Sequence, residues 1–200
     1  MIVGAPAVFA IESGITQTLE RASLLALGFF VIHVGGFRYG VCEERATMLA
    51  SSFDEVVRRI ADRGHHNCPF ALNPDGGKIA DAVSNALYGD GPADEVFFGM
   101  SRAEFSGLVS SKDLLWAPDG DEAFDDGSYV LQFDVEDRVR LIGFQRPRGL
   151  SHEPATLRDI WITAQQYYST LKQWKTDFEA DRSSLISAKD SPKALGHPQE

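Results

Sequence analysis

Two pairs of strand-like segments, each joined by a short turn, constrain the fold more than any other feature of this sequence. In residues 28–42, two apolar and aromatic runs are separated by Gly35 and Gly36, which readily adopt the positive φ angles of a tight hairpin turn. In residues 128–145, two further runs flank a charged turn, and the first alternates as a strand with one buried face does. Both segments therefore predict β-hairpins, and the earlier run "VFAIESGI" predicts one more strand.

A first helix is predicted between the hairpins from signals at both of its ends. Ser52 is followed three residues later by Glu55, which is the pattern of a capping box. Gly64 then ends the apolar periodicity, as glycine does after many helices. These signals predict a helix over residues 52–63.

Two more helices are predicted in the middle of the chain. Asp75 is a candidate N-cap for a helix that ends before Gly89. Ser101 with Glu104 repeats the capping-box pattern and predicts a short helix through Leu108, preceded by the strand-like run "EVFFGM".

The last predicted helix is long and amphipathic. At about 100° per residue, eight apolar side chains of residues 151–178 fall within an arc of roughly 140°. These residues are Leu157, Ile160, Trp161, Ala164, Tyr168, Leu171, Trp174 and Phe178. Such a stripe usually packs into a core, although an aromatic stripe can also fill a groove on a partner.

Together these elements predict a single α+β domain over residues 1–185, followed by a flexible tail over residues 186–200. The expected architecture is a mainly antiparallel β-sheet built from hairpins, with helices packed on one side. A length of 200 residues suits one domain with a substantial core. Because strands and helices do not alternate regularly, a doubly wound nucleotide-binding fold is not expected.

The composition predicts a cytoplasmic protein. No apolar run reaches the roughly 18 residues that span a bilayer, and the first residues lack the features of a secretion signal. Cys42 and Cys68 are consistent with a reducing compartment, in which thiols stay free. We therefore expect no contact with membranes.

The negative charge is concentrated in the middle of the chain. The net charge is -10, and residues 64–150 account for -8 of it, with 7 basic and 15 acidic side chains. A field of this sign repels the phosphate backbone of nucleic acids and attracts basic proteins. An acidic surface can also serve only to keep a protein soluble.

The densest acidic segment is "PDGDEAFDDGSY", residues 118–129. Its five carboxylates belong to Asp119, Asp121, Glu122, Asp125 and Asp126. A calcium-binding loop that began at Asp119 would need ligands or glycine where the chain has Ala123, Phe124 and Val130, so this motif does not match. A less regular site for a hard cation stays open at this stage, because carboxylates alone can bind Ca²⁺ or Mg²⁺.

Other segments with chemical potential are weaker. His65, His66 and Cys68 carry zinc-ligand atoms, but neighbouring histidines do not readily converge on one ion, so a polar loop at the end of a helix is the simpler interpretation. The sequence contains neither a nucleophile elbow nor a phosphate-binding glycine loop. We therefore predict no catalytic residues, no metal and no cofactor.

Four arginines alternate around the second hairpin and would share one strand face. They are Arg138, Arg140, Arg146 and Arg148. They can form a binding patch, or they can balance the nearby Asp134, Glu136 and Asp137 within the protein.

Several segments resemble the bacterial polymorphic-toxin immunity proteins of the immunity protein 42 family. The similarity is carried by "MIVGAPAVFAIES", "GFFVIHVGGFRYG" and "EAFDDGSYVLQFDVEDRVRLIGFQ", and covers about residues 1–63 and 118–180. The resemblance implies a non-catalytic antidote that binds a cognate secreted toxin and protects the producing cell. The family pattern marks core positions such as Phe9, Ile11, Gly36 and Phe124, and it marks no binding site.

The binding surface must therefore be predicted from physical chemistry. Toxins that attack nucleic acids need basic clefts for phosphate, and an acidic loop can occupy such a cleft. We predict that the five carboxylates of residues 119–126 contact a basic toxin surface. Two alternatives stay open at this point, a metal-dependent hydrolase that uses the same carboxylates and a cytoplasmic adaptor unrelated to toxins.

Overall fold

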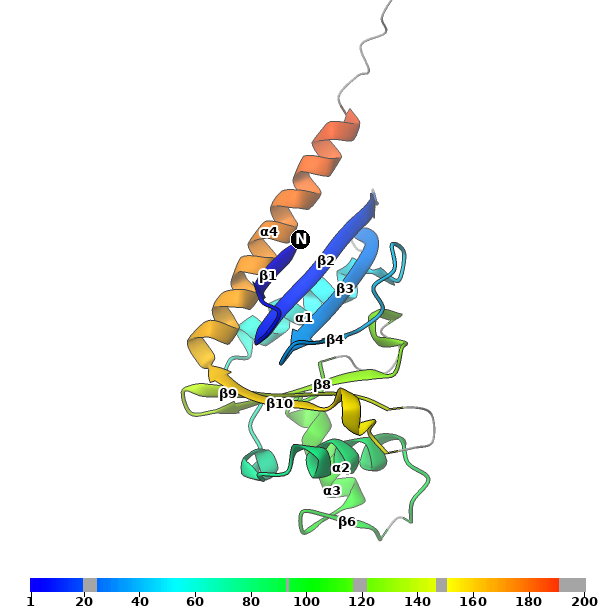
Figure 1. The fold of residues 1–200 in the computed structure, drawn as a ribbon, viewed down its shortest axis with the longest axis vertical. Helices are drawn as coiled ribbons and strands as arrows, with labels where there is room; N and C mark the ends of the chain where they lie inside the picture. The colour runs from blue at the N-terminus through cyan, green and yellow to red at the C-terminus, as the bar shows by residue number, and fades with distance from the viewer. Residues whose placement is uncertain (20–24, 93, 117–121, 147–150, 191–200) are drawn as a thin grey trace, which may run out of the picture.

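The computed structural model describes residues 1–19, 25–92, 94–116, 122–146 and 151–190. The described residues form an α+β fold with three antiparallel sheets and a long C-terminal helix, which confirms the predicted fold class. Figure 1 shows the arrangement in layers, with the long helix beside the N-terminal sheet and a second sheet crossing below them. The predicted division of the chain at residue 185 stays a prediction, and helix α4 continues to Asp190.

The first sheet contains five strands in the order β1-β2-β3-β4, with β5 also paired to β3. Their bounds are β1 Ile2–Ala5, β2 Phe9–Thr18, β3 Ala26–Val34, β4 Phe37–Tyr39 and β5 Thr47–Met48. The turn between β3 and β4 has φ values of 56° at Gly35 and 82° at Gly36, so the predicted hairpin and its turn are confirmed.

Two helices cover one face of the first sheet, α1 (Leu49–Ala61) and α4 (Ala164–Asp190). Their apolar side chains form one core with those of β2 and β3, and Trp174 also donates a hydrogen bond of 3.0 Å to Ser13. The aromatic stripe of the C-terminal helix therefore packs into the core, as predicted.

The second sheet, here called the central sheet, has the strand order β10-β9-β8. Its strands are β8 Ser128–Val135, β9 Arg138–Gln145 and β10 Arg158–Thr163, so the predicted second hairpin is confirmed. The prediction of one buried face was wrong, because both faces of this hairpin are covered. Val130 and Leu141 belong to the core shared with the first sheet, whereas Leu131 and Ile142 belong to a second core.

The second core lies between the central sheet and helices α2 (Gly76–Tyr88) and α3 (Arg102–Ser111). Both predicted caps are confirmed: Asp75 accepts a hydrogen bond from the backbone of Lys78, and Ser101 with Glu104 forms the complete capping box. Short 3-10 turns lie at η1 (Pro69–Leu72), η2 (Glu122–Phe124) and η3 (Pro154–Thr156).

The run "EVFFGM" forms two short strands, β6 (Val96–Phe97) and β7 (Met100–Ser101), where the sequence predicted a single strand. Phe98 and Gly99 both adopt positive φ values, 49° and 82°, and reverse the chain between them. Phe98 is held in this unfavourable conformation while its ring stacks on Phe70 at 5.3 Å. Ring packing therefore accompanies a turn that the residue type alone would not indicate.

Two helix starts differ from the predictions. Helix α1 begins at Leu49, its N-cap Met48 makes no side-chain cap, and Ser52 is buried inside the helix. The helix therefore begins three residues before the predicted cap Ser52, and the buried side chain of Leu49 joins the core. Residues Arg158–Thr163, predicted as the start of the last helix, instead form strand β10 because they pair along the whole edge of β9.

Candidate functional site

The predicted acidic site is described only in part, because Asp119 and Asp121 lie outside the described residues. Glu122, Asp125 and Asp126 have exposed side chains around the short turn η2. Between them, Ala123 and Phe124 are buried, and the backbone of Val41 donates a hydrogen bond of 2.8 Å to the Ala123 carbonyl. We call residues 122–126 the acidic loop; its apolar residues anchor it to the core and leave its carboxylates in solvent.

Asp126 also holds the end of the acidic loop in place. One of its carboxylate oxygens accepts a hydrogen bond from the backbone of Ser128 at 3.0 Å, and the other accepts one from Gln145 at 3.3 Å. Gly127 follows with a φ of 80°, which favours glycine. Asp126 therefore has a local structural role in addition to its charge.

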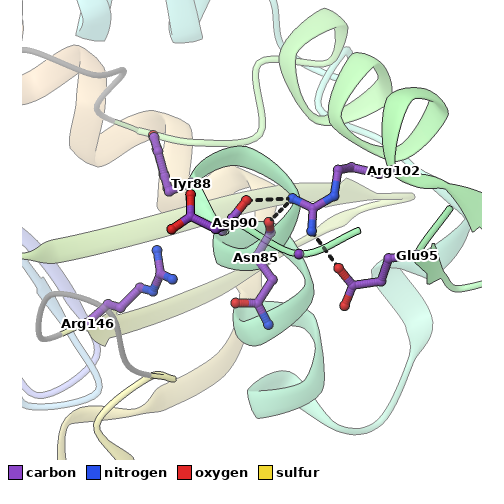
Figure 2. A pocket seen from close by; sticks show the side chains of 8 residues that line it. Asn85, Tyr88, Asp90, Glu95, Arg102 and Arg146 are labelled. Atoms are coloured by element: carbon purple, nitrogen blue, oxygen red, sulfur yellow. Dashed lines mark hydrogen bonds and ion pairs between the residues drawn. The ribbon is translucent and has the colours of Figure 1, made fainter. Parts of the chain in front are cut away.

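A polar cavity of about 560 Å³ lies beside the acidic loop (Figure 2). It is lined by Asn85, Tyr88, Gly89, Asp90, Gly91, Glu95, Arg102 and Arg146. The backbone of Arg146 donates a hydrogen bond of 2.9 Å to Gly127, directly after the acidic loop. The ring of Tyr88 lies 5.8 Å from that of Tyr129, so the C-terminal end of α2 meets the start of β8 here.

Arg102 forms one wall of this cavity. Its Nη1 donates hydrogen bonds to the carbonyls of Asn85 at 2.5 Å and Gly89 at 2.9 Å, and its Nη2 contacts Glu95 at 2.5 Å. Helix α2 has no basic residue in its last turn, so the guanidinium from α3 binds the carbonyls that this helix end exposes. The sequence did not predict this cavity, because residues 85–95 and residue 146 are far apart in the chain.

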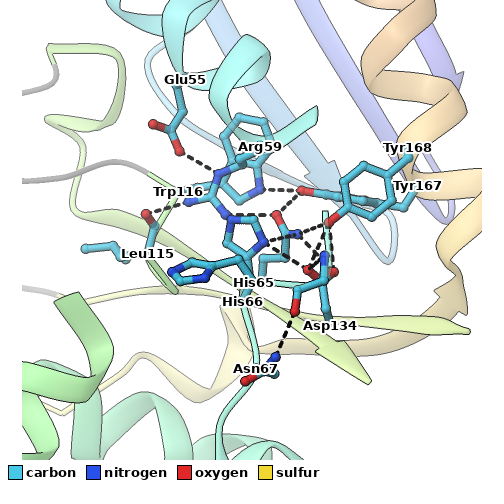
Figure 3. Close-up of polar contacts among 12 residues, drawn as sticks. Glu55, Arg59, His65, His66, Asn67, Leu115, Trp116, Asp134, Tyr167 and Tyr168 are labelled. Atoms are coloured by element: carbon cyan, nitrogen blue, oxygen red, sulfur yellow. Dashed lines mark hydrogen bonds and ion pairs between the residues drawn. The ribbon is translucent and has the colours of Figure 1, made fainter. Parts of the chain in front are cut away.

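A second polar cluster lies inside the protein, between α1, α4 and the central sheet (Figure 3). Arg59 is fully buried, and its guanidinium donates to Glu55 at 2.5 Å, Gln132 at 2.8 Å and the Leu115 carbonyl at 2.7 Å. It also lies 4.6 Å from the centre of the Trp116 ring. We call this cluster, together with the contacts of Asp134 described next, the buried network.

Asp134 collects donors from three segments. Its carboxylate contacts His66 at 2.9 Å, accepts from Tyr168 at 2.9 Å and accepts from the backbone of Gly64 at 2.8 Å. Burial acts to raise the pKa of Asp134, but these hydrogen bonds and the His66 charge outweigh it, so the pKa lies below its ordinary value. The buried network therefore joins α1 and α4 to the central sheet through side-chain hydrogen bonds, and the Nε2 atom of His66 is buried in it without a partner among the described residues.

The zinc alternative is not supported by these positions. His66 is buried against Asp134, whereas His65 is exposed and its ring contacts the Ser111 carbonyl at 2.9 Å. Burial raises the pKa of the Cys68 thiol to about 12, which disfavours the thiolate form that binds zinc. Among the residues that the structure describes, no three His, Cys, Asp or Glu side chains lie together as metal ligands would.

The four arginines of the second hairpin have separate environments. Arg140 is buried and pairs with Asp159 through two contacts of 2.8 Å and 2.5 Å, so its charge is balanced inside the protein. Arg138 lies over the ring of Trp161 at 4.6 Å. Arg146 lines the polar cavity, and Arg148 lies outside the described residues.

In the described part of the chain, none of the helices combines the length and the apolar character needed to cross a bilayer.

The comparison with protein families identifies the relatives of this chain. The model described as Immunity protein 42 matches residues 1–177. The chain belongs to the immunity protein 42 family. The match is continuous, so it also includes residues 64–117, which the resemblance seen in the sequence did not cover.

A solved structure shows the same fold. It is the crystal structure of CdiI from Burkholderia dolosa AUO158, with a TM-score of 0.56 and 14% sequence identity over 88% of this chain and 99% of the other. No curated protein matches the chain. Family membership makes this chain an immunity protein, which neutralises a toxin, and it indicates a binding function rather than an enzymatic one.

Proposed function

We propose that this immunity protein neutralises its toxin by placing the acidic loop and the carboxylates just before it on a basic toxin surface. Membership in the immunity protein 42 family is the observation that carries the toxin as partner. The assignment of the surface is supported by the concentration of negative charge in residues 64–150 and by the exposure of Glu122, Asp125 and Asp126.

The anchored form of the acidic loop suits this role. Phe124 and Ala123 fix the backbone, so little conformational entropy is lost when the neighbouring carboxylates meet a partner. A nuclease is the toxin class that best matches an acidic antidote, because its active cleft must hold phosphate. In this proposal the protein acts in the cytoplasm, catalyses no reaction, needs no cofactor, and binds neither nucleic acid nor membrane.

The test replaces the five acidic residues with their amides and measures affinity for the product of the neighbouring gene. The changes are Asp119→Asn, Asp121→Asn, Glu122→Gln, Asp125→Asn and Asp126→Asn. Asparagine at position 126 keeps a side-chain oxygen that can accept the hydrogen bond from Ser128, so the fold is expected to persist. We expect Kd at low salt to rise by about 100-fold, since several charge pairs are lost together.

A control variant removes the same charge elsewhere. On helix α4, in the middle of α1 and directly after α1, the exposed or half-buried acids suited to this purpose are Asp54, Asp62, Asp177, Glu179 and Asp181. Equal loss of affinity in both variants would mean that the effect comes from net charge alone. Unchanged affinity in the acidic-loop variant would exclude the loop as the toxin-binding surface. The two alternative functions predict other results. A metal-dependent hydrolase should show a higher melting temperature when Mg²⁺ or Ca²⁺ is added. An unrelated adaptor should not protect cells from the toxin.

A further inference from the structure

We infer that the polar cavity at the C-terminal end of α2 receives a lysine or arginine side chain of the toxin. This inference rests on the proposed function, because it takes the toxin surface to be basic. It extends the binding surface from an exposed loop to a pocket that can select one side chain.

The cavity is linked to the end of the acidic loop through the backbone of one residue. Arg146 lines the cavity and its backbone binds Gly127, the residue directly after that loop. Asp90 is exposed and lines the cavity, and Asp94 is exposed four residues later, so a second part of the chain brings acidic side chains to the cavity and its surroundings. A basic partner attracted by one group of carboxylates therefore also meets the other.

The wall of the cavity already binds a guanidinium group. Arg102 donates hydrogen bonds to the carbonyls of Asn85 and Gly89 at the end of α2 and to the carboxylate of Glu95, which is an arrangement that a basic side chain prefers. Gly91 permits this approach, since a Cβ atom there would lie 2.4 Å from Arg102 and 2.5 Å from Glu95. The end of α2 thus favours positive charge by its dipole, and Arg102 already occupies the carbonyls of Asn85 and Gly89.

The mouth of the cavity offers further groups for a cation. Asp90 is exposed there, and Figure 2 shows it between Arg102 and Arg146. The ring of Tyr88 also lines the cavity and can stack with a guanidinium. A volume of about 560 Å³ accommodates a long basic side chain with its hydrating water.

A carboxylate of the partner is the competing occupant, because two arginines line the cavity. Arg102, however, already contacts three acceptors, and the surrounding field is negative. Asp90 and Glu95 would also repel a carboxylate. The balance of these charges favours a cation.

The test measures the affinity of the full-length protein for the product of the neighbouring gene at low and high salt. Asp90→Asn should raise Kd by about tenfold, and Asp90→Lys by more, because the new lysine can occupy the cavity from the protein's own side. Asp94→Asn is the matched control: it removes the same charge from the same segment at a position that does not line the cavity. The increase in Kd caused by Asp94→Asn should stay below about threefold.

Arg146→Gln separates the two occupants. A bound cation predicts equal or tighter binding, whereas a bound carboxylate predicts weaker binding, which would overturn the inference. Alanine substitutions of lysines and arginines on the toxin, each combined with Asp90→Asn, should locate one basic residue whose loss is no longer additive.

The failures of the two proposals differ. If the acidic-loop variant loses affinity while Asp90→Asn and Asp90→Lys retain it, only the cavity is excluded. If the unmodified protein does not bind the neighbouring gene product, the proposed function and this inference both fall. Melting temperatures show whether the variants are folded. Those of the Asp90 and Asp94 variants are expected to match the unmodified protein, because both side chains are exposed.

Discussion

The two faces of the β8–β9 hairpin in the central sheet are both buried, but they are stabilised in different ways. The face toward α1 and α4 carries Gln132 and Asp134, which belong to the buried network. The face toward α2 and α3 carries Phe133 and Phe144, which pack among apolar and aromatic side chains. This face also carries the buried Arg140, whose charge is paired with Asp159 on the edge strand β10. Successive residues of one strand thus enter two unlike environments.

The difference teaches how each face responds to change. In the buried network every charged group depends on its partners, so removing one member leaves others buried and unsatisfied. Apolar contacts lose stability in proportion to the volume removed. The four predictions below test this contrast, beginning with the largest effect.

The first prediction concerns the centre of the buried network. Arg59→Met should lower the free energy of unfolding by about 3–5 kcal/mol, because Glu55 keeps only the more exposed Arg58 as a charge partner, and Gln132 and the Leu115 carbonyl lose their hydrogen bonds to the guanidinium. Urea denaturation followed by circular dichroism measures the change. The double variant Glu55→Leu with Arg59→Met should recover part of the loss, and a single-variant loss below about 1 kcal/mol would contradict the role given to Arg59.

The second prediction concerns pH. Because the pKa of Asp134 is depressed in the folded protein, its contribution to stability is complete above the unfolded value of about 3.9 and is lost as pH falls through the folded value. Asp134→Asn should lower stability by about 1–3 kcal/mol at neutral pH and flatten the decline between pH 4 and lower values. Melting temperatures of both proteins across this range decide the question; parallel curves would speak against it.

The third prediction concerns the apolar face. Ile142 is fully buried in the core beneath the central sheet, and Ile142→Val should cost about 0.5–1.5 kcal/mol without changing the pH dependence. Chemical denaturation at two pH values provides the measurement. A loss as large as that of Arg59→Met would remove the contrast between the two faces.

The fourth prediction compares Ser52 and Ser101, the two serines that the sequence predicted as helix caps. Ser101 caps α3, so Ser101→Ala should cost about 1 kcal/mol. Ser52 lies inside α1 with a buried hydroxyl that has no partner among the described residues, so Ser52→Ala should be neutral or slightly stabilising. Thermal melts of the two variants compare them directly, and equal losses would mean that Ser52 acts as a cap after all.

Prediction from sequence succeeded where the signal was local. Asp75 and Ser101 cap the expected helices because their side chains bond to backbone groups three residues away. Gly35 and Gly36 reverse the chain because few other residues adopt their φ angles without strain. The acidic segment was also evident from its composition, and its three described carboxylates are exposed; its role in toxin binding stays a prediction.

Prediction failed where distant contacts decided the structure. Ile160 and Trp161 fit a helical stripe, but residues 158–163 pair with β9 and become its edge strand. The polar cavity was not foreseen, since Arg102 and Arg146 meet only after the chain has folded. Local spacing contains no information about either meeting.

The sequence by itself determined the turns, two helix caps, the antiparallel class of the fold and the location of its negative charge. Only the tertiary structure decided that both faces of the β8–β9 hairpin are buried, where α1 and α4 begin, and which charged groups share a cavity. The reason is a difference in energy: local propensities distinguish helix from strand by at most about 1 kcal/mol per residue, whereas burying one large apolar side chain contributes about 1.5–3 kcal/mol. Where the two conflict, burial and long-range pairing prevail.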